Sequence, residues 1–90
     1  MKQYNFIISY DISDDKRLRK IAKILEKQAI RIQFSIFYYP KATKQELHNL
    51  LEKILQIYDP KQDDIRVYNI KDSGITLGSG IDLNNPYNFF

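Results

Sequence analysis

The sequence contains no cysteine and only three glycines and three prolines. Without cysteine, disulfide bonds, thiolate metal sites and cysteine nucleophiles are excluded. No glycine-rich phosphate loop is present. The single histidine, His48, has no serine and aspartate arranged for nucleophilic catalysis, so we interpret it as a surface residue of a helix. No apolar run approaches the roughly 20 residues of a membrane-spanning helix, so no membrane partner is expected.

What is present is a chain of 90 residues with 43% hydrophobic and 28% charged residues, which is typical of one small globular domain. A chain of this length buries a modest core and gains stability by oligomerisation. The start, MKQYNFIISYDISDD, has a short apolar stretch that leads into acids, so we interpret it as a first strand rather than a signal peptide. The cytoplasm is therefore the expected location.

The net charge of +3 is distributed unevenly along the chain. Residues 14–31 contain seven basic and three acidic residues, and the rest of the chain is close to neutral. Helical spacing places Lys16, Lys20, Lys23 and Lys27 in one stripe. Such a stripe is either a solvated helix face or a contact surface for a polyanion such as a nucleic acid.

The hydrophobic pattern predicts a β-α-β-β-α-β order. The expected elements are a strand over 4–10, a helix from about 14 to 28, strand material over 30–39 that bends or splits near Phe34 and Ser35, a second helix that starts at the capping box Thr43-x-x-Glu46 and ends before Asp59, and a strand over 65–70. We expect Pro40 to end the strand material before it. Residues 75–78 are a candidate for an extra short strand.

This order predicts an α+β, ferredoxin-like sandwich with both helices on one face of an antiparallel sheet. We place the domain at residues 1–80 and an irregular or partner-docked tail at residues 81–90. The aromatic and aliphatic residues of the strands cannot all face the helices. The other face is therefore a dimer interface or an RNA platform of the RRM type. The RRM aromatic signature is absent, and a dimer packed through the sheets is favoured.

The segment YDISDDKRLRK joins the first strand to the first helix. Asp14 and Asp15 fall at the helix start, where the helix dipole favours negative charge. Asp11 falls at the strand end, where a carboxylate either is solvated or makes a turn hydrogen bond, or binds a hard cation such as Mg²⁺. Tyr10 either orients a phosphate or packs in the sheet. The candidate phosphate contacts are Arg17, Arg19, Lys20, Lys23, Lys27 and Arg31.

YDISDDKRLRK, IRIQFSIF and IRVYNI…LGSG, taken in this order, resemble the Cas2 family of small CRISPR-associated proteins of the spacer-acquisition machinery. The resemblance covers roughly residues 4–80. It implies a ferredoxin-like homodimer joined through the sheets, with a last short strand that often crosses to the partner's sheet. It also implies an endonuclease dependent on Mg²⁺ (or Mn²⁺) that cleaves RNA or double-stranded DNA. The CRISPR integrase is the implied protein partner.

The same resemblance assigns residues to roles. Asp11 is the implied metal ligand, facing its own copy across the two-fold axis of the dimer. Ser35 and Phe37 match family positions near the metal, Ser35 as a polar group and Phe37 as interface packing. The sequence departs from the family pattern at two points: no glycine precedes IRIQ, and Tyr38 stands where an acidic residue is common.

Two functions therefore remain open on the sequence. One is the metal-dependent endonuclease with Asp11, Tyr10 and Ser35 as candidate catalytic residues. The other is a non-catalytic scaffold that holds a nucleic-acid duplex on the basic helix face and bridges integrase dimers. The sequence does not discriminate between RNA and DNA.

Overall fold

The computed structural model describes residues 2–70, which form four strands and two helices in the predicted order. The elements are β1 (Tyr4–Asp11), α1 (Asp15–Glu26), β2 (Ile30–Gln33), β3 (Ile36–Ala42), α2 (Lys44–Leu55) and β4 (Asp64–Ile70). The candidate strand at 75–78, the domain boundary at residue 80 and the tail over 81–90 lie outside the described residues. Neither helix of the described part is long and apolar enough to cross a membrane.

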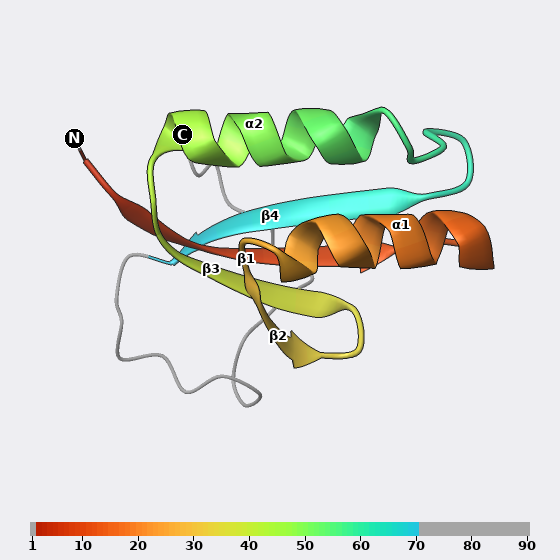
Figure 1. Ribbon diagram of the computed structural model, residues 1–90, viewed down its shortest axis with the longest axis horizontal. Helices are drawn as coiled ribbons and strands as arrows, with labels where there is room; N and C mark the ends of the chain where they lie inside the picture. The colour runs from red at the N-terminus through yellow and green to blue at the C-terminus, as the bar shows by residue number, and fades with distance from the viewer. Residues whose placement is uncertain (1, 71–90) are drawn as a thin grey trace.

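The four strands form one antiparallel sheet in the order β2-β3-β1-β4. β1 lies in the middle, between β3 and β4, and both helices cover the same face (Figure 1). This arrangement confirms the predicted ferredoxin-like α+β fold. Packing of two copies through their sheets stays a prediction.

The main core lies between this face of the sheet and the helices. Alternation along β1 places Phe6, Ile8 and Tyr10 on one face of the sheet, and the structure shows that this is the face that the helices cover. Their partners in the core come from both helices and from the neighbouring strands β3 and β4. These are Phe37, Tyr39 and Ala42 of β3, Ile21 and Leu25 of α1, Leu47, Leu50 and Ile54 of α2, and Val67 of β4.

A second apolar cluster lies on the sheet face that the helices leave uncovered. It contains Ile7, Tyr68 and Ile70, and Ile32, Ile36 and Tyr38 pack against it. Because side chains alternate along a strand, Ser9 and Asp11 share this face with Ile7. The sheet therefore carries its strand-end carboxylate on the face opposite the helices.

Both helices begin at the residues that the sequence indicates. Asp14 is the N-cap of α1, and its carboxylate accepts a hydrogen bond from the Arg17 backbone N–H at 3.0 Å. This bond lowers the pKa of the Asp14 carboxyl. At α2, the Thr43 hydroxyl accepts from the Glu46 N–H and the Glu46 carboxylate accepts from the Thr43 N–H, which completes the capping box.

The segment over 30–39 splits into β2 and β3 at Phe34–Ser35, as predicted. The expectation that Pro40 ends the strand is wrong, because β3 continues to Ala42. The ladder between β1 and β3 is irregular at this point, between Tyr4 and Phe6. Lys41 adopts a φ of 53°, and its N–H donates to the Asn5 side chain at 3.0 Å. A local bulge thus accommodates a residue that lacks the N–H of a regular ladder.

Candidate metal and nucleic-acid site at the end of β1

Asp11 is the last residue of β1, and its side chain is exposed. Among residues 2–70, no hydrogen bond or ion pair reaches its carboxylate. Its Cα partner in the antiparallel ladder is Asp64, the first residue of β4, so two acidic residues lie directly opposite each other. Like charges in this relation repel. The strand end therefore gathers negative charge that a cation can relieve.

Arg66 lies next to this acidic pair and was not singled out from the sequence. It is the ladder partner of Ser9, two residues before Asp11, so it shares the face that carries Asp11. Its Nε donates to the Asp64 carboxylate at 2.8 Å, and this bond raises the pKa of Arg66. Arg66 therefore offsets the charge of Asp64, whereas Asp11 has no such partner among the described residues. Only pairing of β1 with β4 brings these residues together, so no local sequence signal identifies them.

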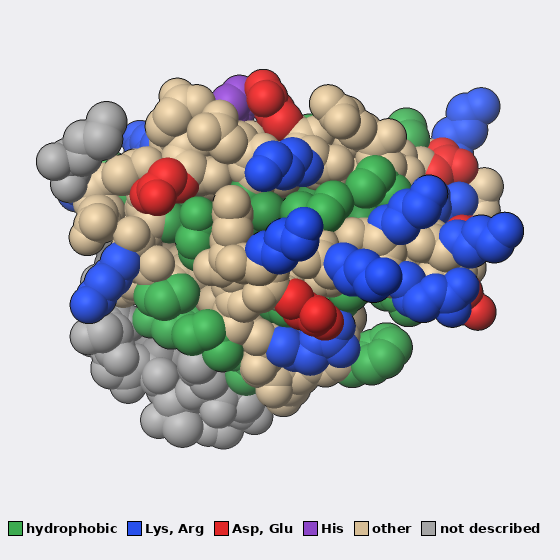
Figure 2. All heavy atoms as spheres, viewed as in Figure 1, with side chains coloured by type: hydrophobic (Ala, Val, Ile, Leu, Met, Phe, Trp, Pro, Cys, Tyr) green, Lys and Arg blue, Asp and Glu red, His purple; other side chains and the backbone are tan. Residues whose placement is uncertain are grey.

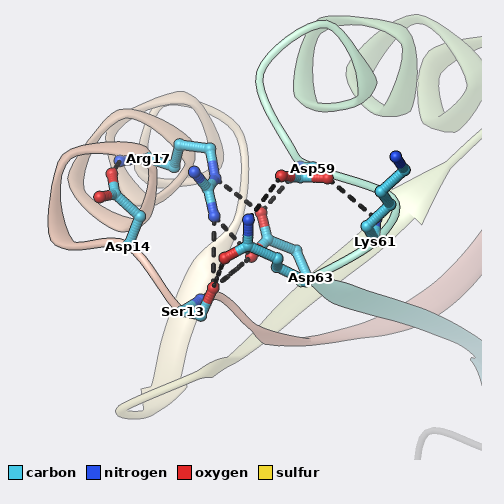
Figure 3. Close-up of polar contacts among 7 residues, drawn as sticks. Ser13, Asp14, Arg17, Asp59, Lys61 and Asp63 are labelled. Atoms are coloured by element: carbon cyan, nitrogen blue, oxygen red, sulfur yellow. Dashed lines mark hydrogen bonds and ion pairs between the residues drawn. The ribbon is translucent and has the colours of Figure 1, made fainter.

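Asp63 is the second residue that the sequence did not reveal. Its side chain has no exposed surface. Its Oδ2 accepts hydrogen bonds from Arg17 Nε at 2.8 Å and from the Asp59 N–H at 2.8 Å (Figure 3). Its Oδ1 accepts from Arg17 Nη2 and the Ser13 N–H, both at 3.0 Å. We call Ser13, Arg17, Asp59 and Asp63 the Asp63 cluster.

The Arg17 guanidinium and the two backbone N–H groups hold the pKa of the Asp63 carboxyl well below its usual range. Because Asp63 precedes β4, the cluster ties the α2–β4 connection to the first turn of α1. Ser13 lies two residues after Asp11, so the cluster also holds the loop that leaves the strand end (Figure 3). The cluster therefore fixes the loop that follows Asp11 and the residue that precedes Asp64, its ladder partner.

Two of the predicted phosphate contacts are already paired. Arg17 has its Nε and Nη2 donors on Asp63. Arg31 donates from Nη2 to Glu26 at 2.9 Å, and its guanidinium lies over the Phe37 ring at 5.1 Å. A phosphate would have to use the remaining donors of these side chains or displace their carboxylates.

The other predicted phosphate contacts are unpaired within the described part of the chain. Arg19, Lys20 and Lys23 are exposed on α1 and Lys27 is exposed at its C-cap, and no ion pair within the described part involves them. Figure 2 shows basic side chains gathered over α1, on the same side of the molecule as the α1 ribbon in Figure 1. These four side chains form the α1 basic face, and they can bind a polyanion without losing an existing partner.

Tyr10 and Phe37 belong to the main core. The Tyr10 side chain is 5% exposed and stacks on Phe37 with a ring-centroid distance of 6.0 Å. Its hydroxyl donates to the Phe34 carbonyl at 3.4 Å, and burial raises its pKa. Tyr10 and Asp11 lie on opposite faces of the sheet, because they are neighbours on one strand. Of the two interpretations of Tyr10, the structure favours packing.

Phe37 has no exposed surface and lies beneath the helices. The prediction that it packs at a dimer interface is not supported, because its side chain leaves no area for a second copy. Ser35 is half-buried in the turn between β2 and β3. Its carbonyl accepts from the N–H of Tyr10 at 3.1 Å. Because Tyr10 directly precedes Asp11, Ser35 lies beside the end of β1. His48 is exposed on α2, as expected, and lies 2.9 Å from Glu52.

A family model for the CRISPR associated protein Cas2 matches residues 4–76 of the chain. The protein belongs to the Cas2 family. A Cas2 relative from Nitrosomonas europaea, named a CRISPR-associated endoribonuclease, is 35% identical over 84% of this chain and 71% of the relative. The family recognised from the sequence motifs is thereby confirmed.

Solved Cas2 structures have the same fold as this chain. The structure of Streptococcus pyogenes Cas2 at pH 6.5 superposes with a TM-score of 0.64, at 32% identity over 71% of this chain and 82% of that chain. A chain of a partial Cas6-RT-Cas1–Cas2 complex superposes with a TM-score of 0.70, at 30% identity over 94% of this chain and 91% of that chain. The two structures place the four-stranded sheet and its helices within the known Cas2 architecture.

The donor chemistry at the end of β1 suits a hard divalent cation, because the exposed Asp11 carboxylate supplies the oxygen ligands that Mg²⁺ prefers. Within residues 2–70 of one copy, however, no group of three or more acidic, histidine or cysteine side chains is arranged to hold a metal ion. Asp11 in this Cas2 protein thus fits a metal as one ligand of a larger set.

Proposed function

We propose that this protein is a homodimeric, divalent-metal-dependent endonuclease of CRISPR spacer acquisition, with Asp11 as its metal ligand. The observation that carries the proposal is the state of Asp11: it is exposed at a strand end and free of hydrogen bonds among the described residues, on the sheet face without helices. The Cas2 relatives named endoribonucleases support the reaction class, and phosphodiester bonds in RNA or double-stranded DNA are its proposed targets.

A dimer packed through the uncovered sheet faces would complete the site. Asp11 and the second apolar cluster share that face, so a contact that covers the partly exposed Ile32, Ile36 and Tyr38 with a second copy would also bring two Asp11 residues toward one axis. Two carboxylates from two copies would bind Mg²⁺ or Mn²⁺ better than one. A bound cation would lower the pKa of a water ligand and neutralise charge on the scissile phosphate.

The neighbouring residues take supporting roles in this proposal. Ser35 contributes a polar group beside the strand end, while Tyr10 anchors the strand from the core side without contacting the reacting atoms. Arg66 is the ladder partner of Ser9, two residues before Asp11, and its Nε donates to Asp64. Its remaining N–H groups would donate to a substrate phosphate near Asp11. The α1 basic face binds the strand that flanks the cleaved bond.

The proposed protein partner is the CRISPR integrase, and the proposed location is the cytoplasm. The matching chain in a Cas1–Cas2 complex supports this partner. The α1 basic face also favours a second candidate function, in which the dimer is a scaffold that holds a DNA duplex between integrase dimers. This scaffold needs the basic residues but not Asp11, which separates the two functions experimentally.

The deciding experiment replaces Asp11 by Asn in the full-length protein. We expect cleavage of labelled RNA and duplex DNA in Mg²⁺ to fall by more than about 100-fold, because the ligand charge is lost. Asp15→Asn is the matched control, since Asp15 is an exposed acid of the first α1 turn, and it should cleave normally. Light scattering and thermal unfolding should show an unchanged dimer for both variants.

Undiminished cleavage by Asp11→Asn would refute the nuclease proposal and leave the scaffold. A crystal structure of the dimer with Mn²⁺ gives an independent readout. A shared ion requires the two Asp11 carboxylates to lie roughly 4–5 Å apart at normal metal–oxygen distances.

A further inference from the structure

Phe34 is an aromatic side chain that the fold leaves in solvent. It is 73% exposed, compared with 59% for Ile30 and 50% for Leu55, the other large exposed hydrophobic residues of the described part. It occupies the first position of the two-residue turn between β2 and β3. Neither core cluster includes it. Packing within one copy therefore does not explain this phenylalanine.

The turn that carries Phe34 is held against the end of β1. The Phe34 carbonyl accepts from the Tyr10 hydroxyl at 3.4 Å, and the Ser35 carbonyl accepts from the Tyr10 N–H at 3.1 Å. Tyr10 is itself fixed in the core by its stack on Phe37. The exposed ring thus projects from a backbone that is anchored one residue before Asp11.

The surroundings of this turn indicate which kind of molecule binds at Phe34. The α1 helix begins at the same end of the molecule (Figure 1), and residues 14–31 carry a net charge of +4. The α1 basic face is unpaired within residues 2–70 and is exposed (Figure 2). An exposed aromatic ring and a basic surface on one molecule are the combination that binds single-stranded nucleic acid, in which bases stack on the ring while cations contact the phosphates.

We propose that Phe34 stacks on an unpaired nucleobase adjacent to the phosphate that lies at Asp11. This inference rests on the proposed function and extends it to substrate class: the preferred strand is single-stranded or locally unpaired. Bases inside a continuous duplex are already stacked on their neighbours and offer no free face to the ring. A duplex without a break or an end at this position therefore binds without using Phe34.

The test compares Phe34→Leu, Phe34→Tyr and the control Leu55→Ala in the full-length protein. Binding is measured with single-stranded RNA oligonucleotides that carry 2-aminopurine at successive positions, because stacking on an aromatic ring quenches this base. We expect Phe34→Leu to weaken binding by about tenfold and to abolish quenching at one position. Phe34→Tyr should retain both signals, and Leu55→Ala should bind like the unaltered protein. With an abasic site at the quenched position, the unaltered protein and Phe34→Leu should bind with equal affinity.

Three results would overturn the inference. Equal binding and equal quenching by Phe34→Leu would show that the ring makes no contact with the strand. A change of oligomeric state in Phe34→Leu, measured by light scattering, would identify a second copy as the occupant. An equal loss in Phe34→Leu and Phe34→Tyr would exclude stacking. If Asp11-dependent cleavage persists in any of these cases, the proposed function stands and only the role of Phe34 fails.

Discussion

Asp11 and Asp63 are two carboxylates at the same end of the sheet with opposite environments. The Asp63 side chain is fully buried, and its two oxygens accept five hydrogen bonds from Arg17, Ser13 and Asp59. Asp11 is exposed, and no hydrogen bond or ion pair within residues 2–70 involves its side chain. Asp64, which follows Asp63 directly, is the ladder partner of Asp11, so the two environments are separated by little more than one strand spacing.

The difference shows which acid is available for chemistry. A carboxylate whose lone pairs are already occupied by charged and backbone donors gains little from a metal ion and stabilises the fold instead. A carboxylate in solvent, beside a second acid, gains from any cation that reaches it. The same distinction separates the bases, because Arg17 neutralises Asp63 whereas the α1 basic face has no such partner in the described part.

The largest expected difference between Asp63 and Asp11 is in their contributions to the free energy of unfolding. Asp63→Ala should lower the free energy of unfolding by about 2 kcal/mol, because it leaves Arg17 and two backbone N–H groups without their acceptor. The loss should stay below that of a fully buried ion pair, since the Arg17 side chain is 24% exposed. Asp11→Ala should change the value by less than about 0.5 kcal/mol. Urea unfolding of both variants measures the difference, and equal losses would contradict the assignment.

Sequence reasoning located the elements of this end of the molecule because their signals are local. The Asp14 cap, the Thr43–Glu46 capping box and the break at Phe34–Ser35 each involve residues within a few positions of one another. Asp63 was missed because Arg17 and Ser13 are 46 and 50 residues away in the chain. No short motif records a contact of that separation.

The assignment of Phe37 failed for a related reason. Alternation shows which residues of a strand share a face, but it does not show which face the helices cover. Phe37 lies on the covered side with Tyr10, whereas Asp11 lies on the other side. The position of Asp11 at the strand end was predictable, because a polar residue after an apolar run marks that end. Its register against Asp64 follows only from the pairing of β1 with β4.

The next effect concerns the bases. Replacing Lys20, Lys23 and Lys27 by Gln should weaken binding of a DNA duplex by about tenfold at moderate salt, because fewer counterions are released. The salt slope of the logarithm of the association constant should fall by about 2–3 units if each lysine contacts one phosphate. The control replaces the exposed Lys41, Lys53 and Lys61, which belong to β3, α2 and the α2–β4 connection and not to α1. An equal loss of affinity in both triple variants would show that only the net charge of the protein matters and that the α1 basic face is not the DNA site.

The smallest expected effect is the response of stability to acid. The pKa of the Asp63 carboxyl is lowered in the folded state by the Arg17 guanidinium, so folding favours the ionised form. Asp63 therefore contributes its full stabilisation above the ordinary aspartate pKa of about 3.9, and this contribution decreases as the pH falls from there toward the folded pKa.

At about pH 3.5 the folded carboxylate is still ionised, while the unfolded chain has taken up most of a proton at this residue. That difference lowers stability by about 0.7 kcal/mol relative to neutral pH, whatever the depth of the folded pKa. Asp63→Asn should lose this part of the acid dependence, whereas Asp11→Asn should keep it. Urea unfolding of the three proteins at about pH 7 and about pH 3.5 measures the two slopes. A slope that disappears with Asp11 instead of Asp63 would mean that the exposed acid, and not the buried one, is coupled to folding.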